Sequence, residues 1–323
     1  MKTVEMREAG GPDVLVGGTR AVPVAADHEV LIKVSAAGVN GPDLVQRRGH
    51  YPPPPDASDL LGLEVSGEIV AIGDAVRTRS VGERVCALTN GGGYAAYVAV
   101  DAAHCLPIPE GVDERDAAGL PETFFTVWSN CFHTERPTPG SLFLVHGGAG
   151  GIGSTATQLG AALGLRVFAT CGGEQNARHC LANGAERAID YTCEDFETIV
   201  REAGGAELIL DIVGGPYIAR NIKAAKADGR IVQLAFNQGS KVEINLMPIM
   251  LKRLTYTGST LRSRPAPFKS EIARALSEEV WPLFATAQLR THTHEIFPFD
   301  RAAQAHALLE SGGHRGKLLL TPD

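Results

Sequence analysis

LVHGGAGGIGSTATQLG, residues 144–160, is the stretch on which the interpretation of this 323-residue chain depends. It overlaps the apolar run SLFLVHG (141–147), which predicts a strand, and continues into GIGSTATQLGAALG (151–164), which predicts a helix. Gly148, Gly150 and Gly153 form the spacing G-x-G-x-x-G. Between a strand and a helix this spacing is typical of dinucleotide sites, where glycines bring a pyrophosphate close to the helix N-terminus. The alternative is a purely structural glycine-rich turn.

Apolar strands alternate with helical patterns on the carboxyl side of this stretch. The expected strands are RVFAT (166–170), RAID (187–190), ELILDIV (207–213) and RIVQLAF (230–236). The expected helices between them are 175–184, 194–205 and 217–229. This alternation predicts βαβ units, and so an α/β fold with a doubly wound parallel sheet.

The first 120 residues are instead β-rich. Short apolar or alternating runs, bounded by turn residues, predict strands at 29–39, 64–73, 83–89 and 93–100. Beyond residue 262 the pattern predicts a long amphipathic helix over 270–289, then a strand (291–299), a helix (300–312) and a last strand (316–321). Two domains are therefore expected, one of them β-rich.

Composition excludes several classes of protein. The net charge is −7, so the chain lacks the cationic balance of proteins that bind nucleic acid or membrane surfaces. No apolar run approaches the length of a membrane span. The six cysteines form no C-x-x-C pair and the N-terminus lacks an apolar signal region, which predicts reduced thiols and a cytoplasmic location.

The choice of nucleotide depends on the end of the second strand of the βαβ unit. NAD sites usually carry an acidic residue there, about 20 residues beyond the glycine loop, but residues 170–173 read TCGG. Arg178 could instead pair with the 2′-phosphate of NADPH, and the Tyr191 hydroxyl could assist, although Glu174 opposes this and Arg178 could be merely solvated. NADPH is the expected cofactor, with NADH left open.

Several ordered motifs extend the argument to nearly the whole chain. They are GVNGPDLVQRRGHYPPPP (38–55), LGLEVSGEIVAIG (61–73), GGGYAAYVAV (91–100), LPETFFTVW (120–128), ILDIVGG (209–215), LRSR (261–264) and the closing GKLLL. Because it carries these motifs in this order together with the glycine loop, the chain resembles the zinc-independent quinone oxidoreductases of the medium-chain dehydrogenase/reductase superfamily.

The resemblance implies a GroES-like catalytic domain over 1–121, completed by 263–323, and a Rossmann domain over 122–262 with a cleft between them. It also implies a homodimer that joins Rossmann edge strands, here TYTGST (255–260). Relatives with catalytic zinc place a Cys where this chain has Asn40 and a His where it has Leu63, so no metal is expected. The family's lysine and serine for the 2′-phosphate are missing at Asn176 and Gly173.

The resemblance assigns Asn40 and Tyr51 as the catalytic hydrogen-bond donors. Phe236 and Asn237 follow the fifth Rossmann strand, at the edge where ligands bind. The residues expected to bind the cofactor are Asn40, Thr126, Gly148, Gly150, Gly151, Ile152, Gly153, Gly172, Arg178, Tyr191, Phe236, Asn237 and Lys317.

The expected reaction is hydride transfer from NADPH to a small quinone, because a conjugated acceptor needs no metal electrophile. The alternatives are reduction of an activated C=C bond in an enone or enoyl substrate, and a non-enzymatic, crystallin-like nucleotide-binding protein.

An ion pair between Asp43 and Arg47 or Arg48 is expected to pin the loop that carries these residues. His146 is expected to be a satisfied strand-end histidine and not a catalytic base.

Overall fold

The structure is a computed structural model that describes residues 1–55 and 57–322. It divides into two units, one formed by residues 1–125 with 262–323 and the other by residues 126–261. Among the described residues, no helix combines the length and apolar character that a membrane crossing needs.

The first unit is built on β-sheet. A seven-stranded sheet has the order β14-β15-β3-β4-β5-β7, with β6 also paired to β3. These strands are β3 (Glu29–Val39), β4 (Glu64–Ile72), β5 (Arg84–Leu88), β6 (Tyr97–Asp101), β7 (Cys105–Pro107), β14 (Thr293–Pro298) and β15 (Lys317–Thr321). A separate antiparallel pair joins β1 (Lys2–Met6) to β2 (Leu15–Thr19). The parallel pairing of β14 with β15 and the antiparallel pairing of β15 with β3 bring the C-terminal segment into this sheet.

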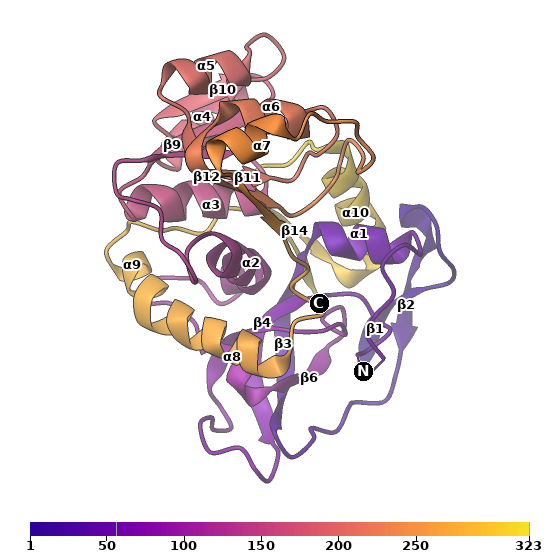
Figure 1. The fold of residues 1–323 in the computed structure, drawn as a ribbon. Coiled ribbons are helices and arrows are strands. Elements are labelled where there is room, and N and C mark those ends of the chain that lie inside the picture. Colours follow the sequence, from indigo (N-terminus) through magenta and orange to yellow (C-terminus); the bar gives the residue numbers. More distant parts are fainter. Residues whose placement is uncertain (56, 323) are drawn as a thin grey trace. The chain divides into compact units, whose positions relative to one another are not determined.

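Helices and turns complete the first unit. They are η1 (Pro12–Val14), α1 (Gly41–Arg47), η2 (Ala102–His104), η3 (Asp116–Gly119), α8 (Ala266–Ala275), the π-helical turn η4 (Leu276–Val280), α9 (Pro282–Ala285), η5 (Phe299–Arg301) and α10 (Ala302–Ser311). Helix α1 lies beside α10 (Figure 1). The core packs alternate, inward-facing residues of β3, such as Val30, Ile32 and Val34, against apolar residues of β15 and α10.

The second unit contains a six-stranded sheet of order β10-β9-β8-β11-β12-β13, and every neighbouring pair is parallel. Its strands are β8 (Leu142–Val145), β9 (Arg166–Cys171), β10 (Arg187–Asp190), β11 (Ala206–Asp211), β12 (Ala225–Gln233) and β13 (Thr255–Gly258). The chain runs outward from β8 to β10, then returns beside β8 and runs the other way. The strand order therefore reverses between β8 and β11, the point where open α/β sheets bind ligands.

Helices cover both faces of this parallel sheet, as the alternating pattern predicts. They are α2 (Pro121–Cys131), which begins in the first unit, α3 (Gly151–Ala162), α4 (Glu174–Ala182), α5 (Phe196–Glu202), α6 (Tyr217–Ala224) and α7 (Met247–Lys252). On one face Phe196 of α5 and Ile218 of α6 pack on Leu142 and Leu144 of β8. Figure 1 shows α5, α6 and α7 gathered together. On the other face Cys180 of α4 packs beneath the glycine loop.

Among the predicted elements, two helices differ most from the structure. The helix expected over 270–289 begins earlier, at Ala266, and is interrupted by the π-helical turn before α9. Pro282 begins α9, because proline is accepted in a first turn and not in a helix interior. The helix expected over 217–229 ends at Ala224, and β12 begins at the next residue.

Candidate functional site

The glycine loop connects β8 to α3 at the carboxyl edge of the parallel sheet. The Gly148 amide donates to the Thr170 carbonyl of β9 at 2.8 Å, which ties the loop to the neighbouring strand. A Cβ on Gly153 would lie 2.6 Å from Gly148 Cα, so only glycine lets α3 start this close to the loop. Gly150 is the N-cap of α3 and has no side chain to cap the first amides, which leaves them available to an anion.

The end of β9 supplies the next predicted residues. Gly172 lies under Tyr191, since a Cβ there would be 2.6 Å from the Tyr191 hydroxyl, and Tyr191 is 52% exposed. Arg178 forms an ion pair with Glu174 one turn earlier on α4, and both side chains are exposed. Asp190 was not predicted as a site residue, and its carboxylate accepts from the Gly173 amide at 3.1 Å. Its place at the end of the third strand was the available signal.

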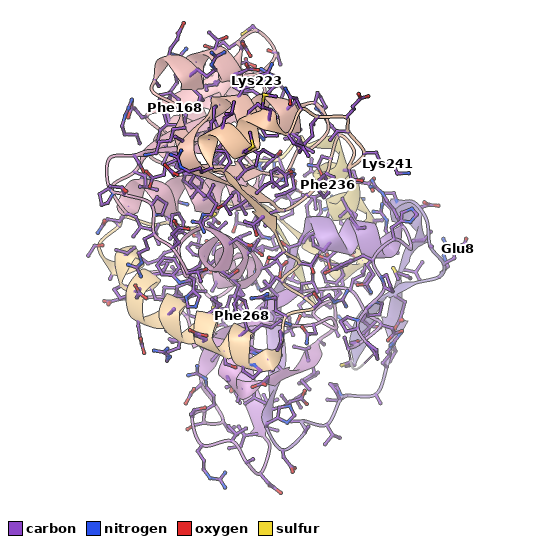
Figure 2. All side chains as sticks on the ribbon, viewed as in Figure 1. Glu8, Phe168, Lys223, Phe236, Lys241 and Phe268 are labelled. Carbon is purple, nitrogen blue, oxygen red and sulfur yellow. The ribbon has the colours of Figure 1, made fainter. Side chains whose placement is uncertain are left out.

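The turn after β12 carries Phe236 and Asn237. The side chain of Phe236 is labelled in Figure 2. This residue is 46% exposed. The amide of Asn237 donates to the Ile212 carbonyl at 3.3 Å, and that of Gln238 donates to Val213 at 2.7 Å. The turn is thus bonded to the one that follows β11. The glycine loop, Gly172 and this turn all lie at the same edge of the sheet, whereas the half-buried Thr126 is on α2.

Asn40 and Lys317 meet in a buried cluster of the first unit. The Lys317 ammonium donates to Glu64 Oε1 at 2.7 Å and to Asn40 Oδ1 at 2.6 Å. The Asn40 amide nitrogen donates to the same Glu64 oxygen at 2.9 Å, while Glu64 Oε2 accepts from the Glu122 backbone amide at 2.8 Å. Glu64 is fully buried, so its negative charge is compensated by a lysine and by neutral donors.

The expected ion pair of Asp43 with a neighbouring arginine is wrong. Asp43 is the third residue of α1, and its carboxylate accepts from the N-cap amide of Asn40 at 2.8 Å and from the Gly62 amide at 3.0 Å. Arg47 and Arg48 pair with Glu310 instead. The spacing Asn40-x-x-Asp43 is that of a capping box, in which the acidic side chain satisfies the free amide at the helix start.

Tyr51 lies beside a second buried polar group of the first unit. The guanidinium of Arg262 is 5.6 Å from the centre of its ring. Arg262 donates from Nε at 2.9 Å and from Nη2 at 2.6 Å to the Asn90 carbonyl, and Lys269 donates to Asn90 Oδ1 at 2.6 Å. Lys269, which was not predicted as a site residue, fixes the loop around Asn90 although it lies 179 residues further along the chain.

Burial shifts the ionisation of these groups. It raises the pKa of Glu122 to about 8, with further contributions from the charges of Glu64 and Asp43. It raises the pKa of Asp43 to about 6, against the two amides that stabilise the carboxylate. It lowers the pKa of Lys269 to about 8, and it raises the pKa of Tyr51 above its ordinary value. Glu122 is therefore mainly protonated at neutral pH.

His146 is fully buried at the end of β8. Its ring nitrogens contact Thr170 Oγ1 at 3.0 Å and Asn221 Oδ1 at 2.8 Å. Burial lowers the pKa of this histidine below its ordinary value. These contacts use both nitrogens within the protein, as expected for a satisfied histidine.

The two units together define a class of protein: dehydrogenases and reductases in which a GroES-like domain accompanies a dinucleotide-binding sheet. Residues 26–110 match the family described as "Alcohol dehydrogenase GroES-like domain", and residues 183–320 match "Zinc-binding dehydrogenase". The quinone oxidoreductase of Rattus norvegicus is 32% identical over 99% of this chain and 97% of the relative. The human quinone oxidoreductase is 31% identical over the same shares. The chain belongs to the quinone oxidoreductase family.

Solved structures agree with this assignment. The Escherichia coli quinone oxidoreductase complexed with NADPH superposes with a TM-score of 0.89 at 27% identity, and each chain is covered completely. An enoyl reductase shares the fold, with a TM-score of 0.86 at 23% identity over 99% of this chain and 98% of the other.

Proposed function

We propose that this protein transfers hydride from NADPH to a small quinone without a metal ion. Bound NADPH would supply the hydride. The chain's own residues then have three tasks: to hold the pyrophosphate, to orient the acceptor, and to stabilise the charge that develops on its oxygen. We assign the first task to the second unit and the other two to the first unit.

The observation that carries the proposal is the replacement of zinc ligands in the first unit. The family description names zinc, but the amide of Asn40 and the aliphatic Leu63 are not zinc ligands. The remaining carboxylate, Glu64, already accepts from Lys317, Asn40 and the Glu122 amide. These residues do not fit a catalytic zinc. Substrates that need a Lewis acid are disfavoured, and conjugated acceptors such as quinones are favoured.

The relatives support NADPH as the cofactor, since one solved structure holds it. We assign its pyrophosphate to the glycine loop and to the free amides at the start of α3. We assign its 2′-phosphate to Tyr191 and Arg178, in place of the missing lysine and serine. NADH remains an alternative hydride donor, because Glu174 neutralises Arg178 and so weakens the selection for the 2′-phosphate.

We assign Tyr51 as the donor to the acceptor oxygen. Quinone reduction adds a hydride and then a proton, and the raised pKa of Tyr51 keeps its hydroxyl protonated. Asn40 is the second predicted donor, although its amide is already bonded to Glu64. Tyr51→Phe should lower turnover and leave the NADPH dissociation constant unchanged.

The decisive experiment measures NADPH and NADH oxidation over a panel of quinones and enones, with product analysis. Hydroquinone formation at the highest kcat/KM supports the proposal. A saturated ketone as the preferred product would move the assignment to C=C reduction. No oxidation with any acceptor would favour the non-enzymatic alternative.

We further propose that the protein is a cytoplasmic homodimer formed through β13. Every residue of this edge strand is exposed, and α7 buries none of its residues. Met250 and Leu251 are 69% and 64% exposed, which is unusual for large apolar side chains unless a partner covers them. Sedimentation should give a dimer that Met250→Lys dissociates, while Val24→Lys, at another exposed apolar position, leaves it intact. The six thiols, all free, suit a reducing compartment.

A further inference from the structure

The turns that follow β8 and β11 are joined by buried polar side chains. His146, Thr170, Asn221 and Asp211 are each at most 1% exposed. They come from the end of β8, from β9, from α6 and from the end of β11. The strand order reverses between β8 and β11, so this chain of contacts lies at the topological switch point of the sheet.

The contacts are continuous from one turn to the other. Asp211 Oδ1 accepts from the amides of Val213 at 2.6 Å and Gly214 at 3.0 Å. Its Oδ2 accepts from Asn221 Nδ2 at 2.9 Å, and Asn221 Oδ1 lies 2.8 Å from His146 Nε2. His146 Nδ1 lies 3.0 Å from Thr170 Oγ1, which accepts from the Gly147 amide at 3.3 Å.

The two ends of this chain fix the direction of every hydrogen bond. A carboxylate can only accept, so Asn221 donates to Asp211 and presents its oxygen to His146. His146 Nε2 therefore carries the proton, and the bare Nδ1 accepts from the Thr170 hydroxyl. Thr170 can then accept the Gly147 amide, which can only donate. One tautomer of a neutral imidazole satisfies all of these groups.

The surroundings of His146 keep the ring neutral. Phe196 and Tyr217 pack edge-on against it, with ring centres at 4.7 and 4.8 Å. Burial, the largest effect, and the charge of Arg220, from α6, disfavour the imidazolium, whereas the charge of Asp211, from β11, favours it. Arg220 also lies 3.9 Å from the centre of the Phe196 ring. An imidazolium would turn Nδ1 into a donor and leave the Thr170 hydroxyl proton without its acceptor.

We propose that Asp211, Asn221, His146 and Thr170 are positioning residues for the dinucleotide. They hold the glycine loop and the turn after β11 in the shape that receives the pyrophosphate. The Gly147 and Gly148 amides both bond to Thr170, which leaves the later amides to the ligand. This inference rests on the proposed function only in taking NADPH as the ligand.

The first test reads the tautomer of His146 in the wild-type protein and uses a variant only to assign the signal. Nitrogen-15 NMR of imidazole-labelled protein distinguishes the two neutral tautomers and the imidazolium. We expect His146, assigned by His146→Gln, to be a neutral ring protonated at Nε2 from pH 6 to 8, with and without NADPH. A ring protonated at Nδ1, or an imidazolium, would overturn the proposal.

The second test measures ligand affinity. Thr170→Val removes the hydroxyl without a change of shape and should raise the NADPH dissociation constant about tenfold, the value of one buried hydrogen bond. Thr170→Ser should restore most of the affinity. The matched control is Thr157→Val, because Thr157 is also fully buried and its hydroxyl has no partner among the described residues. It should bind NADPH like the wild type.

A ligand without a pyrophosphate separates positioning from general damage. Adenosine 2′-monophosphate should bind Thr170→Val and the wild type equally. An equal loss for both ligands, or wild-type NADPH affinity in Thr170→Val, would overturn the inference. A wild-type protein that binds NADPH but reduces no quinone would contradict the proposed function alone.

Discussion

Two glycines of the same loop have different physical reasons to be glycine. Gly150 has an extended backbone (φ −77°, ψ 178°), and a Cβ there would lie 3.7 Å from the Gly147 carbonyl oxygen. A side chain is therefore compatible with the protein itself. Gly153 has no such room, because its Cβ would lie 2.6 Å from Gly148 Cα. The first glycine keeps space for a ligand, and the second lets the chain pack.

We therefore predict that a substitution at Gly150 changes cofactor affinity and that one at Gly153 changes stability. Gly150→Val should leave the melting temperature within about 2 °C of the wild type and raise the NADPH dissociation constant at least tenfold, since the side chain occupies pyrophosphate space. Gly153→Ala should lower the melting temperature by several degrees, as overpacking costs about 1–3 kcal/mol. Calorimetry and fluorescence titration measure both quantities. Unchanged affinity in Gly150→Val would remove the loop from the cofactor site.

At the scale of elements, the start of α4 sets the charge near the predicted 2′-phosphate site. Glu174 and Arg178 neutralise one another, and both are exposed, so the pair contributes little to stability. The pair has a larger effect on the binding of a doubly charged phosphate, because an unpaired guanidinium attracts the phosphate and a carboxylate repels it.

Glu174→Gln should raise the ratio of kcat/KM for NADPH over NADH about three- to tenfold, since it frees Arg178. Arg178→Ala should lower the same ratio. Glu278→Gln is the matched control, because it breaks another exposed pair one turn apart, with Arg274, in the first unit. Steady-state kinetics with both cofactors decide the matter. If neither Glu174→Gln nor Arg178→Ala changes this ratio, the 2′-phosphate binds elsewhere.

Local patterns predicted most elements, because the spacing of apolar residues within a short segment distinguishes strands from helices. The strand expected over 29–39 coincides with β3. The short strands β1 and β2 and the helices α1 and α7 were not predicted, since each is too short for its pattern to stand out. Contacts distant in sequence were also missed. Lys269 donates a hydrogen bond to Asn90, and no spacing in the sequence predicts this pair.

On the scale of the whole molecule, the first unit buries several ionisable groups together. Glu64, Glu122 and Asp43 share their surroundings with Lys317 and Lys269, and all five are at most 9% exposed. Their charges cannot all be satisfied by pairing. The unit therefore binds a proton at Glu122 that the unfolded chain releases, and its stability must depend on pH.

The sign of this dependence follows from the direction of the shift. The pKa of Glu122 rises from 4.5 to about 8 on folding, so its contribution is complete at low pH and is lost as pH rises through 8. The pKa of Asp43 is also raised, but only to about 6, so its contribution to the pH dependence of stability lies at lower pH. Burial lowers the pKa values of His146 and His306, so these histidines make stability fall as pH drops below about 6.5, which is the opposite direction. Lys269, with a pKa lowered to about 8, acts above that value.

Between pH 6.5 and 8 the titration of Glu122 should therefore dominate. We predict that the free energy of unfolding falls across this range, by at most about 1.4 kcal/mol per pH unit, as for the release of one proton. Glu122→Gln, which imitates the protonated carboxyl, should flatten the profile. Glu68→Gln, at an exposed glutamate of β4, should leave it unchanged. Urea unfolding at four pH values measures the slopes, and equal slopes in the wild type and Glu122→Gln would show that Glu122 is ionised in the folded protein.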